Sequence, residues 1–471
     1  MSHLSITTLA LGLLAGGTLA VAQHGEPVDA QTTVAKQPVD ERVEHHPNGQ
    51  LKFRCKLDRE GRLNGKYVEY YDTGVVAVET TYKKDEISGK YASFHSDGEP
   101  WITTSYKNGV ISGKYVERRD GGERTISGVY KRGLREGDFV VKAGKETLRL
   151  QGWKADVMVT VDEVEVHPRP LELVWNTLNE IHDPANSWGG EGLGFLDEPS
   201  GKRRPNDAAL TNERDACLRR LLAYRFLAGV AWRDMLVSAR FNHHADAAAR
   251  LLFTAGALGE KPVNPGWSKK EYNHAMLGVA SCNHAYAATL VEALTQGMAQ
   301  RGSGGVGFRT SMLDPKLMAT GFGRFETVNA IWFDDESRSF EPDYEMICFP
   351  APGYMPIEYF GKLHSWSIEL NPANHAAIAF KNDVRVRLYR LDEDWVRDGA
   401  ALELAFRNFW DRTIAFKPLE TDCTPGARYE VQVEGIRHDK VGSSLTYFVE
   451  FVEPAETEPA GPGKLETNPA H

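Results

Sequence analysis

The stretch Gly304–Gly323, GGVGFRTSMLDPKLMATGFG, decides which fold the middle of the chain is expected to adopt. It runs from a glycine cluster through Leu313–Pro315 to the closely spaced glycines Gly321 and Gly323. The cluster holds a formal GxGxxG pattern that begins at Gly302, and a dinucleotide site would need a strand before this pattern and a helix after it. Here the glycines follow a helical run and precede Leu-Asp-Pro, so the sequence argues against a bound dinucleotide.

The residues around this stretch have helical and strand periodicity. Between Glu213 and Val230, apolar side chains recur at i, i+3, i+4, i+7 and i+8, which is typical of an amphipathic helix. The positions from Leu236 to Leu251 define a second helix. Arg324–Asp334 alternates apolar and polar residues, which indicates a strand.

These segments resemble, over about residues 213–335, bacterial members of the cysteine-rich secretory protein (CAP) superfamily, which read in outline V-G-H-R…L-(D/N)-P…G-F-G. Glu213–Val230 and His243–Leu252 are similar to the first two helices of that domain, and Pro265–Asn283 to the loop and helix that follow. The resemblance implies a central α-β-α sandwich.

The two histidine positions of the family's cavity are changed in this chain. The His-Arg pair is replaced by Phe308-Arg309, and the histidine after the second helix falls in Leu258–Pro262, LGEKP. Phenylalanine cannot ligate a metal or move a proton, and a lone carboxylate at Glu260 is a poor zinc ligand set. We therefore expect a scaffold that has lost its usual site, with no catalytic residue, no bound metal and no cofactor.

A few polar side chains remain as candidates for a binding cavity. They are Glu260, His244, His284 and Arg309. In an alternative interpretation, His243, His244, His274 and His284 form a relocated zinc or hydrolase site with Glu260 or Glu271, since imidazole and carboxylate suit zinc. The competing interpretation places these histidines at the surface or at helix ends. A Cys282–His284 nucleophile pair is disfavoured, because helical positions two apart point away from each other.

Residues 41–154 are a repeat array. Gly-Lys-Tyr begins at Gly65, Gly89 and Gly113, and Gly-Asp-Phe begins at Gly137, always 24 residues apart. Turn signals such as Asn48-Gly49 separate short alternating runs, so each unit is predicted to be a hairpin that must stack on its neighbours. The pattern is similar to the MORN-like repeat variant of exported bacterial proteins. The aromatic residues of the units are predicted to form the stacking core.

The array is basic within an acidic protein. It has 22 Lys and Arg against 17 Asp and Glu, a net charge of +5, whereas the whole chain has a net charge of −10. One interpretation is a surface for an anionic partner, such as phospholipid head groups or an acidic polymer. The other is a solvated sheet in which lysine discourages strand pairing. The overall acidity argues against broad nucleic-acid binding.

The N-terminus indicates export. Residues 1–22 have an apolar run and a small-x-small pattern before Gln23, as in a cleaved signal peptide, with an uncleaved membrane anchor as the alternative. Residues 23–40 are predicted to be a linker, and no other stretch approaches membrane length. The five cysteines include no C-x-x-C pair; Cys217 and Cys282, both in the CAP-like region, could form a disulfide, but the sequence alone leaves the pairing open. We expect a secreted or periplasmic protein.

The remaining segments complete the predicted fold class. Residues 155–212 are a connecting segment that includes a strand at Val157–Val166 and a helix at Leu171–Ile181. Residues 340–452 alternate with a period of two, as in an immunoglobulin-like β-sandwich, and residues 453–471 are predicted to be disordered. The prediction is an α+β multidomain chain with an N-terminal β-hairpin repeat array, a central α-β-α sandwich and a C-terminal immunoglobulin-like β-sandwich.

The sequence thus favours an exported, non-enzymatic binding or interaction protein at the cell envelope or outside it. Its partner is an unidentified envelope, lipid or protein ligand, not nucleic acid. The alternative is a hydrolase or metal-dependent enzyme that uses the histidines and Glu260. A third possibility is a structural envelope protein in which the array adheres to the envelope.

Overall fold

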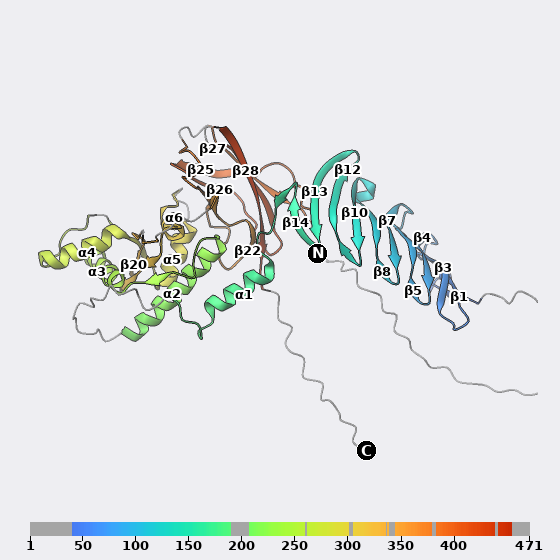
Figure 1. Ribbon diagram of the computed structural model, residues 1–471, viewed down its shortest axis with the longest axis horizontal. Helices are drawn as coiled ribbons and strands as arrows, with labels where there is room; N and C mark the ends of the chain where they lie inside the picture. The colour runs from blue at the N-terminus through green and yellow to red at the C-terminus, as the bar shows by residue number, and fades with distance from the viewer. Residues whose placement is uncertain are drawn as a thin grey trace, which may run out of the picture.

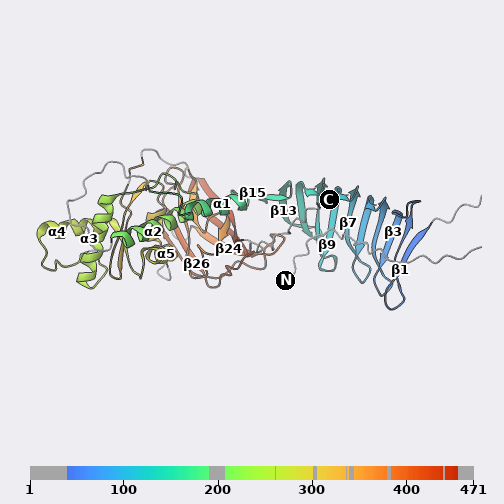
Figure 2. The same ribbon diagram turned by 90° about the horizontal axis from the view of Figure 1, so that it is seen from below.

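A computed structural model of the chain describes most of its residues and shows an elongated molecule. The repeat sheet forms one end, the helices form the other, and the C-terminal strands lie between them (Figures 1 and 2). The described residues are 40–189, 207–259, 261–300, 305–335, 337–338, 344–378, 383–438 and 441–454. The predicted signal peptide, nearly all of the predicted linker and tail, and Glu260 lie outside these residues.

The repeat array is one antiparallel sheet of 15 strands. Its longer strands follow one another in chain order, and the short strands β5, β8 and β11 pair with β4, β7 and β10. The strands are β1 (Glu41–His45), β2 (Leu51–Leu57), β3 (Leu63–Tyr70), β4 (Val76–Lys83), β5 (Glu86–Ile87), β6 (Gly89–Phe94), β7 (Pro100–Lys107), β8 (Val110–Ile111), β9 (Gly113–Arg119), β10 (Arg124–Lys131), β11 (Leu134–Arg135), β12 (Gly137–Ala143), β13 (Glu146–Lys154), β14 (Val157–Val161) and β15 (Val164–Glu165). The sheet therefore continues past residue 154, but the single strand predicted at Val157–Val166 is wrong, because Asp162 and Glu163 adopt φ values of 49° and 69° and turn the chain into the β14–β15 hairpin.

Aromatic rings line one face of this sheet. Tyr67 stacks on Phe53 with ring centroids 5.4 Å apart, and Tyr115 meets Tyr130 at 5.2 Å. Phe139, in the last clear repeat unit, is buried against the same ladder. A Cβ at Gly128 would lie 2.4 Å from the Phe139 ring, so glycine is required at that position. The aromatic residues are thus stacking core, as predicted.

The central region contributes six α-helices and short strands among the described residues. They are α1 (Leu171–His182), α2 (Asp207–Leu227), β16 (Leu236–Val237), α3 (Ala239–Ala255), α4 (Lys269–Ser281), β17 (Cys282–Tyr286), α5 (Leu290–Ala299), α6 (Gly307–Leu313), β18 (Ala319–Thr320), β19 (Phe322–Phe325) and β20 (Val328–Trp332). The helix predicted at Leu171–Ile181 is confirmed by α1. The single strand predicted at Arg324–Asp334 is wrong, because Glu326 adopts φ 54° and turns the chain into the β19–β20 hairpin.

The C-terminal strands form two four-stranded sheets. One sheet has the order β21-β23-β26-β25 and the other β22-β28-β27-β24, in which β22 and β28 are parallel. Their bounds are β21 (Met346–Phe349), β22 (Gly353–Pro356), β23 (Trp366–Leu370), β24 (Arg385–Leu391), β25 (Leu404–Trp410), β26 (Thr413–Pro418), β27 (Arg428–His438) and β28 (Val441–Val452). β24 alternates buried and more exposed residues, as expected for a strand with one covered face, whereas successive residues of β21, β23 and β26 are buried, so both faces of that sheet are covered.

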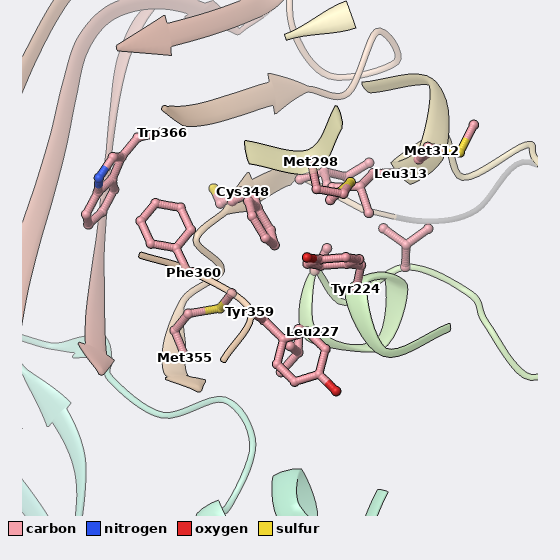
Figure 3. Close-up of a cluster of buried hydrophobic side chains, with 14 of the residues drawn as sticks. Tyr224, Leu227, Met298, Met312, Leu313, Cys348, Met355, Tyr359, Phe360 and Trp366 are labelled. Atoms are coloured by element: carbon pink, nitrogen blue, oxygen red, sulfur yellow. The ribbon is translucent and has the colours of Figure 1, made fainter. Parts of the chain in front are cut away.

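One hydrophobic core joins the helices to these two sheets. Tyr224 of α2 and Met298 of α5 belong to the same buried cluster as Cys348 and Trp366 of the sheets (Figure 3). The ring of Tyr224 lies 5.8 Å from that of Phe349. A second, smaller cluster packs α3 and α4 against β17 and β20. The helices α2, α5 and α6 therefore do not belong to an independent central unit.

These observations correct the predicted fold class. The described chain is mostly β, with 43% of residues in strands and 21% in helices, and its largest element is the 15-stranded sheet. An α+β chain with a separate central α-β-α sandwich is therefore wrong. The helical periodicity at 213–335 correctly predicts helices. It does not show that these helices share a core with residues beyond 345.

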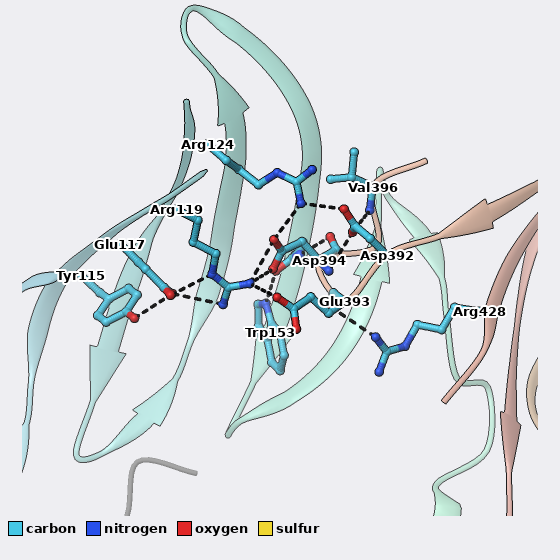
Figure 4. Close-up of polar contacts among 11 residues, drawn as sticks. Tyr115, Glu117, Arg119, Arg124, Trp153, Asp392, Glu393, Asp394, Val396 and Arg428 are labelled. Atoms are coloured by element: carbon cyan, nitrogen blue, oxygen red, sulfur yellow. Dashed lines mark hydrogen bonds and ion pairs between the residues drawn. The ribbon is translucent and has the colours of Figure 1, made fainter. Parts of the chain in front are cut away.

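Ion pairs connect the end of the array to the C-terminal sheets. Arg119 of β9 pairs with Asp394, and Arg124 of β10 pairs with Asp392, at 3.1 Å and 2.6 Å (Figure 4). Asp392 and Asp394 belong to the loop that follows β24. The array is thus held to the loop by ion pairs rather than by the chain connection alone.

The structure also shows the state of the cysteines. All five cysteines are free thiols, so the bridge considered for Cys217 and Cys282 is absent.

In the part of the chain that the structure describes, no helix is long and apolar enough to cross a membrane.

Candidate functional site

Three of the central histidines meet where α3 begins beside α4. The ring centroid of His274 lies 4.0 Å from that of His244 and 4.5 Å from that of His243. His244 is buried, and its Nδ1 lies 3.1 Å from the carbonyl oxygen of His274. Burial, followed by the neighbouring His244 and His243, lowers the pKa of His274 to about 4. The His274 ring is therefore neutral at pH 7 where it packs against the other two.

His284, on β17, is placed against α4 and not in this stack. Its Nε2 is buried without a hydrogen-bond partner, and burial lowers its pKa to about 4. Burial, with Asp334 acting in the same direction, raises the pKa of Cys282. A reactive cysteine needs a lowered pKa beside a cationic imidazole. Both shifts oppose that chemistry, so the pair Cys282–His284 lacks the properties of a nucleophile and its base.

Arg309 is a structural residue of the core. Its side chain is fully buried, and it donates hydrogen bonds to the carbonyl oxygen of Met298 at 2.8 Å and 2.6 Å and to Ser367 Oγ at 2.8 Å. Burial lowers its pKa to about 9, so the guanidinium stays charged at neutral pH. These bonds tie α5 and α6 to β23. Phe308 fills the space that glycine leaves at Gly297.

The candidate residues of the resemblance are thus not brought together as one site by the described structure. Glu271 closes the capping box of α4 with Ser268, and Glu260 lies outside the described residues. Within the described ranges, no group of three or more His, Cys, Asp or Glu side chains is placed to hold a metal ion.

The buried histidines predict a loss of stability in acid. Since the pKa of His284 falls to about 4 on folding, the unfolded chain binds more protons between pH 6.5 and pH 4. The free energy of unfolding should therefore decrease as pH falls through this window, by up to about 3 kcal/mol from His284. Urea unfolding across this range should show a shallower pH dependence in His284→Phe.

Replacement of the exposed His45 by glutamine is the control for this prediction. That variant should keep the pH dependence of the parent protein, because His45 stands in the edge strand β1 with its side chain in solvent. A His284→Phe protein with an unchanged pH dependence would contradict the assignment.

A groove of about 710 Å³ lies on the face of the repeat sheet opposite the aromatic ladder. Its cations are Lys66, Lys90, Lys114 and Arg118, from β3, β6 and β9. Its other lining residues are Glu79, Thr80, Thr81, Tyr91, Ala92, Thr103, Thr104, Ser105 and Val116. The three lysines follow the repeat glycines directly, so they occupy one position in three successive units.

Strand pairing explains why these lysines form a row. Lys66 is directly opposite Thr81, and Lys90 is directly opposite Ser105. Paired residues point to the same face, and neighbouring strands are about 4.8 Å apart, so successive lysines are roughly 10 Å apart. The repeat period of 24 residues thus becomes a regular spacing of charge across the sheet.

The electrostatics of the groove favour an anion. Glu79 is its sole carboxylate among the lining residues, and it approaches Lys66 Nζ to 3.3 Å. The two side chains are 43% and 67% exposed, so this pair is worth little and leaves the lysine available. Arg118 has a buried Nη1 without a hydrogen-bond partner. Lys90 and Lys114 are exposed at the groove.

Sequence reasoning found the basic array but not this groove. The signal was the lysine of each Gly-Lys-Tyr unit, at the same 24-residue interval as the turns. Its meaning depends on strand pairing, which places Lys66 and Lys90 on the same face as Thr81 and Ser105, whereas Tyr67 and Tyr91 share the other face with Thr80 and Thr104.

No protein-family model matches the chain, and a search of curated proteins found no significant match. The CAP and MORN-like resemblances therefore stay predictions, and the interpretation of the groove depends on its own geometry.

Proposed function

We propose that this is an exported, non-enzymatic binding protein that holds an anionic partner in the groove of its repeat array. The observation that carries the proposal is the row of Lys66, Lys90 and Lys114 along that groove. In this proposal the protein acts at the cell envelope or outside it, as residues 1–22 suggest, and the helical region serves as a scaffold. The packed roles of His244 and Arg309 support a scaffold, since neither side chain is free for a ligand.

The distribution of charge supports the same proposal. The array has a net charge of +5 while the rest of the chain carries −15, because the whole has −10. An anionic partner is attracted to the array and repelled by the remaining surface, which favours one orientation of approach. Since the lysines are exposed, this attraction should weaken as salt is added.

The decisive variant is Lys66→Gln/Lys90→Gln/Lys114→Gln in the full chain. We expect its affinity for soluble polyanions to fall at least about tenfold, because three charge contacts of up to about 1 kcal/mol each are lost. Binding of fluorescently labelled polygalacturonate and polyphosphate, followed by anisotropy at low and physiological salt, measures this change. The unfolding midpoint should stay the same, because the three side chains are exposed.

Lys107→Gln/Lys131→Gln/Lys154→Gln is a matched control. These lysines are also exposed residues of the array, but they stand at hairpin ends and do not line the groove. The control should lose less than about threefold in affinity. An equal loss in both variants would show general attraction to a basic sheet, and absence of any polyanion binding by the parent protein would overturn the proposed function.

A further inference from the structure

We infer that the anionic partner is an acidic polysaccharide that lies across the strands, with its carboxylates on the lysines and its hydroxyl groups on the residues between them. This inference rests on the proposed function and names the ligand class of the same groove. The feature that carries it is a single row in which cations and hydroxyl groups alternate.

The row crosses β3, β4, β6, β7 and β9, with direct pairing within β3–β4 and within β6–β7. Lys66 faces Thr81, and Lys90 faces Ser105. The pairing of β4 with β6 ends at Glu79 and Ala92, and the register then shifts, because the Thr81 carbonyl oxygen accepts a hydrogen bond from the amide of Ser88; Thr81 and Lys90 both line the groove. The same shift occurs between β7 and β9, where the pairing ends at Thr103 and Val116, the Ser105 carbonyl oxygen accepts from the amide of Ser112, and Ser105 and Lys114 both line the groove. The order across the sheet is thus cation, hydroxyl, cation, hydroxyl, cation.

This order matches a polymer whose charges are separated by uncharged, hydroxyl-bearing units. Lysines two strands apart are roughly 10 Å from each other, and a hydroxyl group stands midway between them. An acidic polysaccharide can place carboxylates at such intervals and offers sugar hydroxyl groups to Thr81 and Ser105. Lysine donates to the carboxylate, while the threonine and serine side chains both donate and accept.

A second row argues against a densely charged partner. Glu79 and Thr103 belong to the groove beside the lysine row, and Glu79 remains 43% exposed. A carboxylate there accepts hydrogen bonds from sugar hydroxyl groups, but it repels a continuous chain of phosphates. The cations also line a hollow, which a flexible chain enters more readily than the flat surface of a bilayer.

The test compares ligand classes on the full-length protein. Oligogalacturonides of increasing length, their methyl esters, polyphosphate, single-stranded DNA and phosphatidylglycerol vesicles are titrated against it by calorimetry or anisotropy. We expect affinity for the oligogalacturonides to rise with length until the chain spans Lys66 to Lys114, roughly 19 Å over four strand spacings, and then to level off. The methyl esters should bind at least tenfold more weakly.

Thr81→Val/Ser105→Ala separates sugar recognition from charge alone. We expect this variant to bind oligogalacturonides about tenfold more weakly, because two hydrogen bonds are lost, and to bind polyphosphate as the parent does. Thr81 is exposed and Ser105 is half-buried, and the unfolding midpoint monitors their folding.

The outcomes distinguish the two proposals. If polyphosphate, DNA or vesicles bind more tightly than oligogalacturonides, and the lysine triple variant abolishes that binding, the polysaccharide inference is overturned. The proposed function then remains intact. Equal loss of all ligands in the hydroxyl variant would likewise overturn the polysaccharide inference. Failure of every polyanion to bind would overturn both.

Discussion

Arg149→Met is expected to lower the local free energy of unfolding at the junction of the array and the C-terminal sheets by about 3–5 kcal/mol. Arg149 of β13 is 5% exposed and forms an ion pair with Glu430 of β27, which is 2% exposed. It also donates to the carbonyl oxygen of Trp395 at 2.5 Å. Removing the guanidinium leaves a buried carboxylate with a single remaining cation, Arg397, which lies at the rim. Hydrogen exchange of β13 and β27 should accelerate by two orders of magnitude or more.

Two further variants make this prediction specific. Arg387→Met breaks the exposed pair of Arg387 with Glu434 and should cost less than about 1 kcal/mol. Adding Glu430→Leu to Arg149→Met should recover part of the loss, because the unpaired buried charge is then gone. Equal exchange rates in the parent and in Arg149→Met would show that the junction is held by other contacts.

The same carboxylate gives the junction a pH dependence. Burial alone would raise the pKa of Glu430, but hydrogen bonds and charges from Arg397 and Arg149 leave the pKa below its ordinary value. Its contribution to stability is therefore present above the pKa of an unfolded glutamate and is lost as pH falls through the lower folded value. This loss begins in more acidic solution than the loss expected from His284.

The repeat array could be predicted well from the sequence because its structure is local. Each hairpin lies within one 24-residue unit, and its turn residues identify where the chain reverses. Gly74 and Gly98 adopt φ values of 84° and 91° at these turns, a conformation that glycine reaches without strain. The alternation between turns then fixes which side chains share a face.

The central region could not be predicted as well because its packing depends on residues far apart in the chain. The periodicity of α2 shows an apolar face but not the partner of that face, which includes Phe349 and Trp366. Likewise, the helix expected up to Asn283 ends at Ser281, and Cys282–Tyr286 pairs with β20 as a strand. A short apolar run fits either state when its neighbours are unknown.

The candidate site likewise contains features that the sequence could predict and features that it could not. Arg309 was proposed for a cavity because of its place in a motif, yet its side chain is fully buried among carbonyl groups. The regular interval between the groove lysines can be read from the sequence. The interval alone does not show which face of the sheet the lysines occupy. That information comes from the register of β3, β4, β6, β7 and β9.

Gly323→Ala is expected to lower the free energy of unfolding by roughly 3 kcal/mol or more, because α3 lies directly on this residue of β19. A Cβ at Gly323 would come within 2.1 Å of the backbone of Ala245 and Asp246. Backbone atoms cannot rotate aside as a side chain does, so α3 would have to move. That movement would stretch the hydrogen bond of 3.1 Å from the Arg324 amide to Asp246 Oδ1. Urea unfolding measures the loss.

Gly307→Ala is the control from the same glycine-rich stretch. Nothing lies within 4 Å of a Cβ at Gly307, which is the first residue of α6, so alanine should leave stability unchanged or raise it by up to about 1 kcal/mol. Equal destabilisation by both substitutions would contradict the close approach of α3. Destabilisation by Gly323→Ala alone would give a physical reason for the Gly-Phe-Gly sequence. A Cβ at Gly321 likewise has no room beside the backbone of Phe241. The spacing of these glycines then reflects a helix that crosses a strand in direct contact, whichever family the chain belongs to.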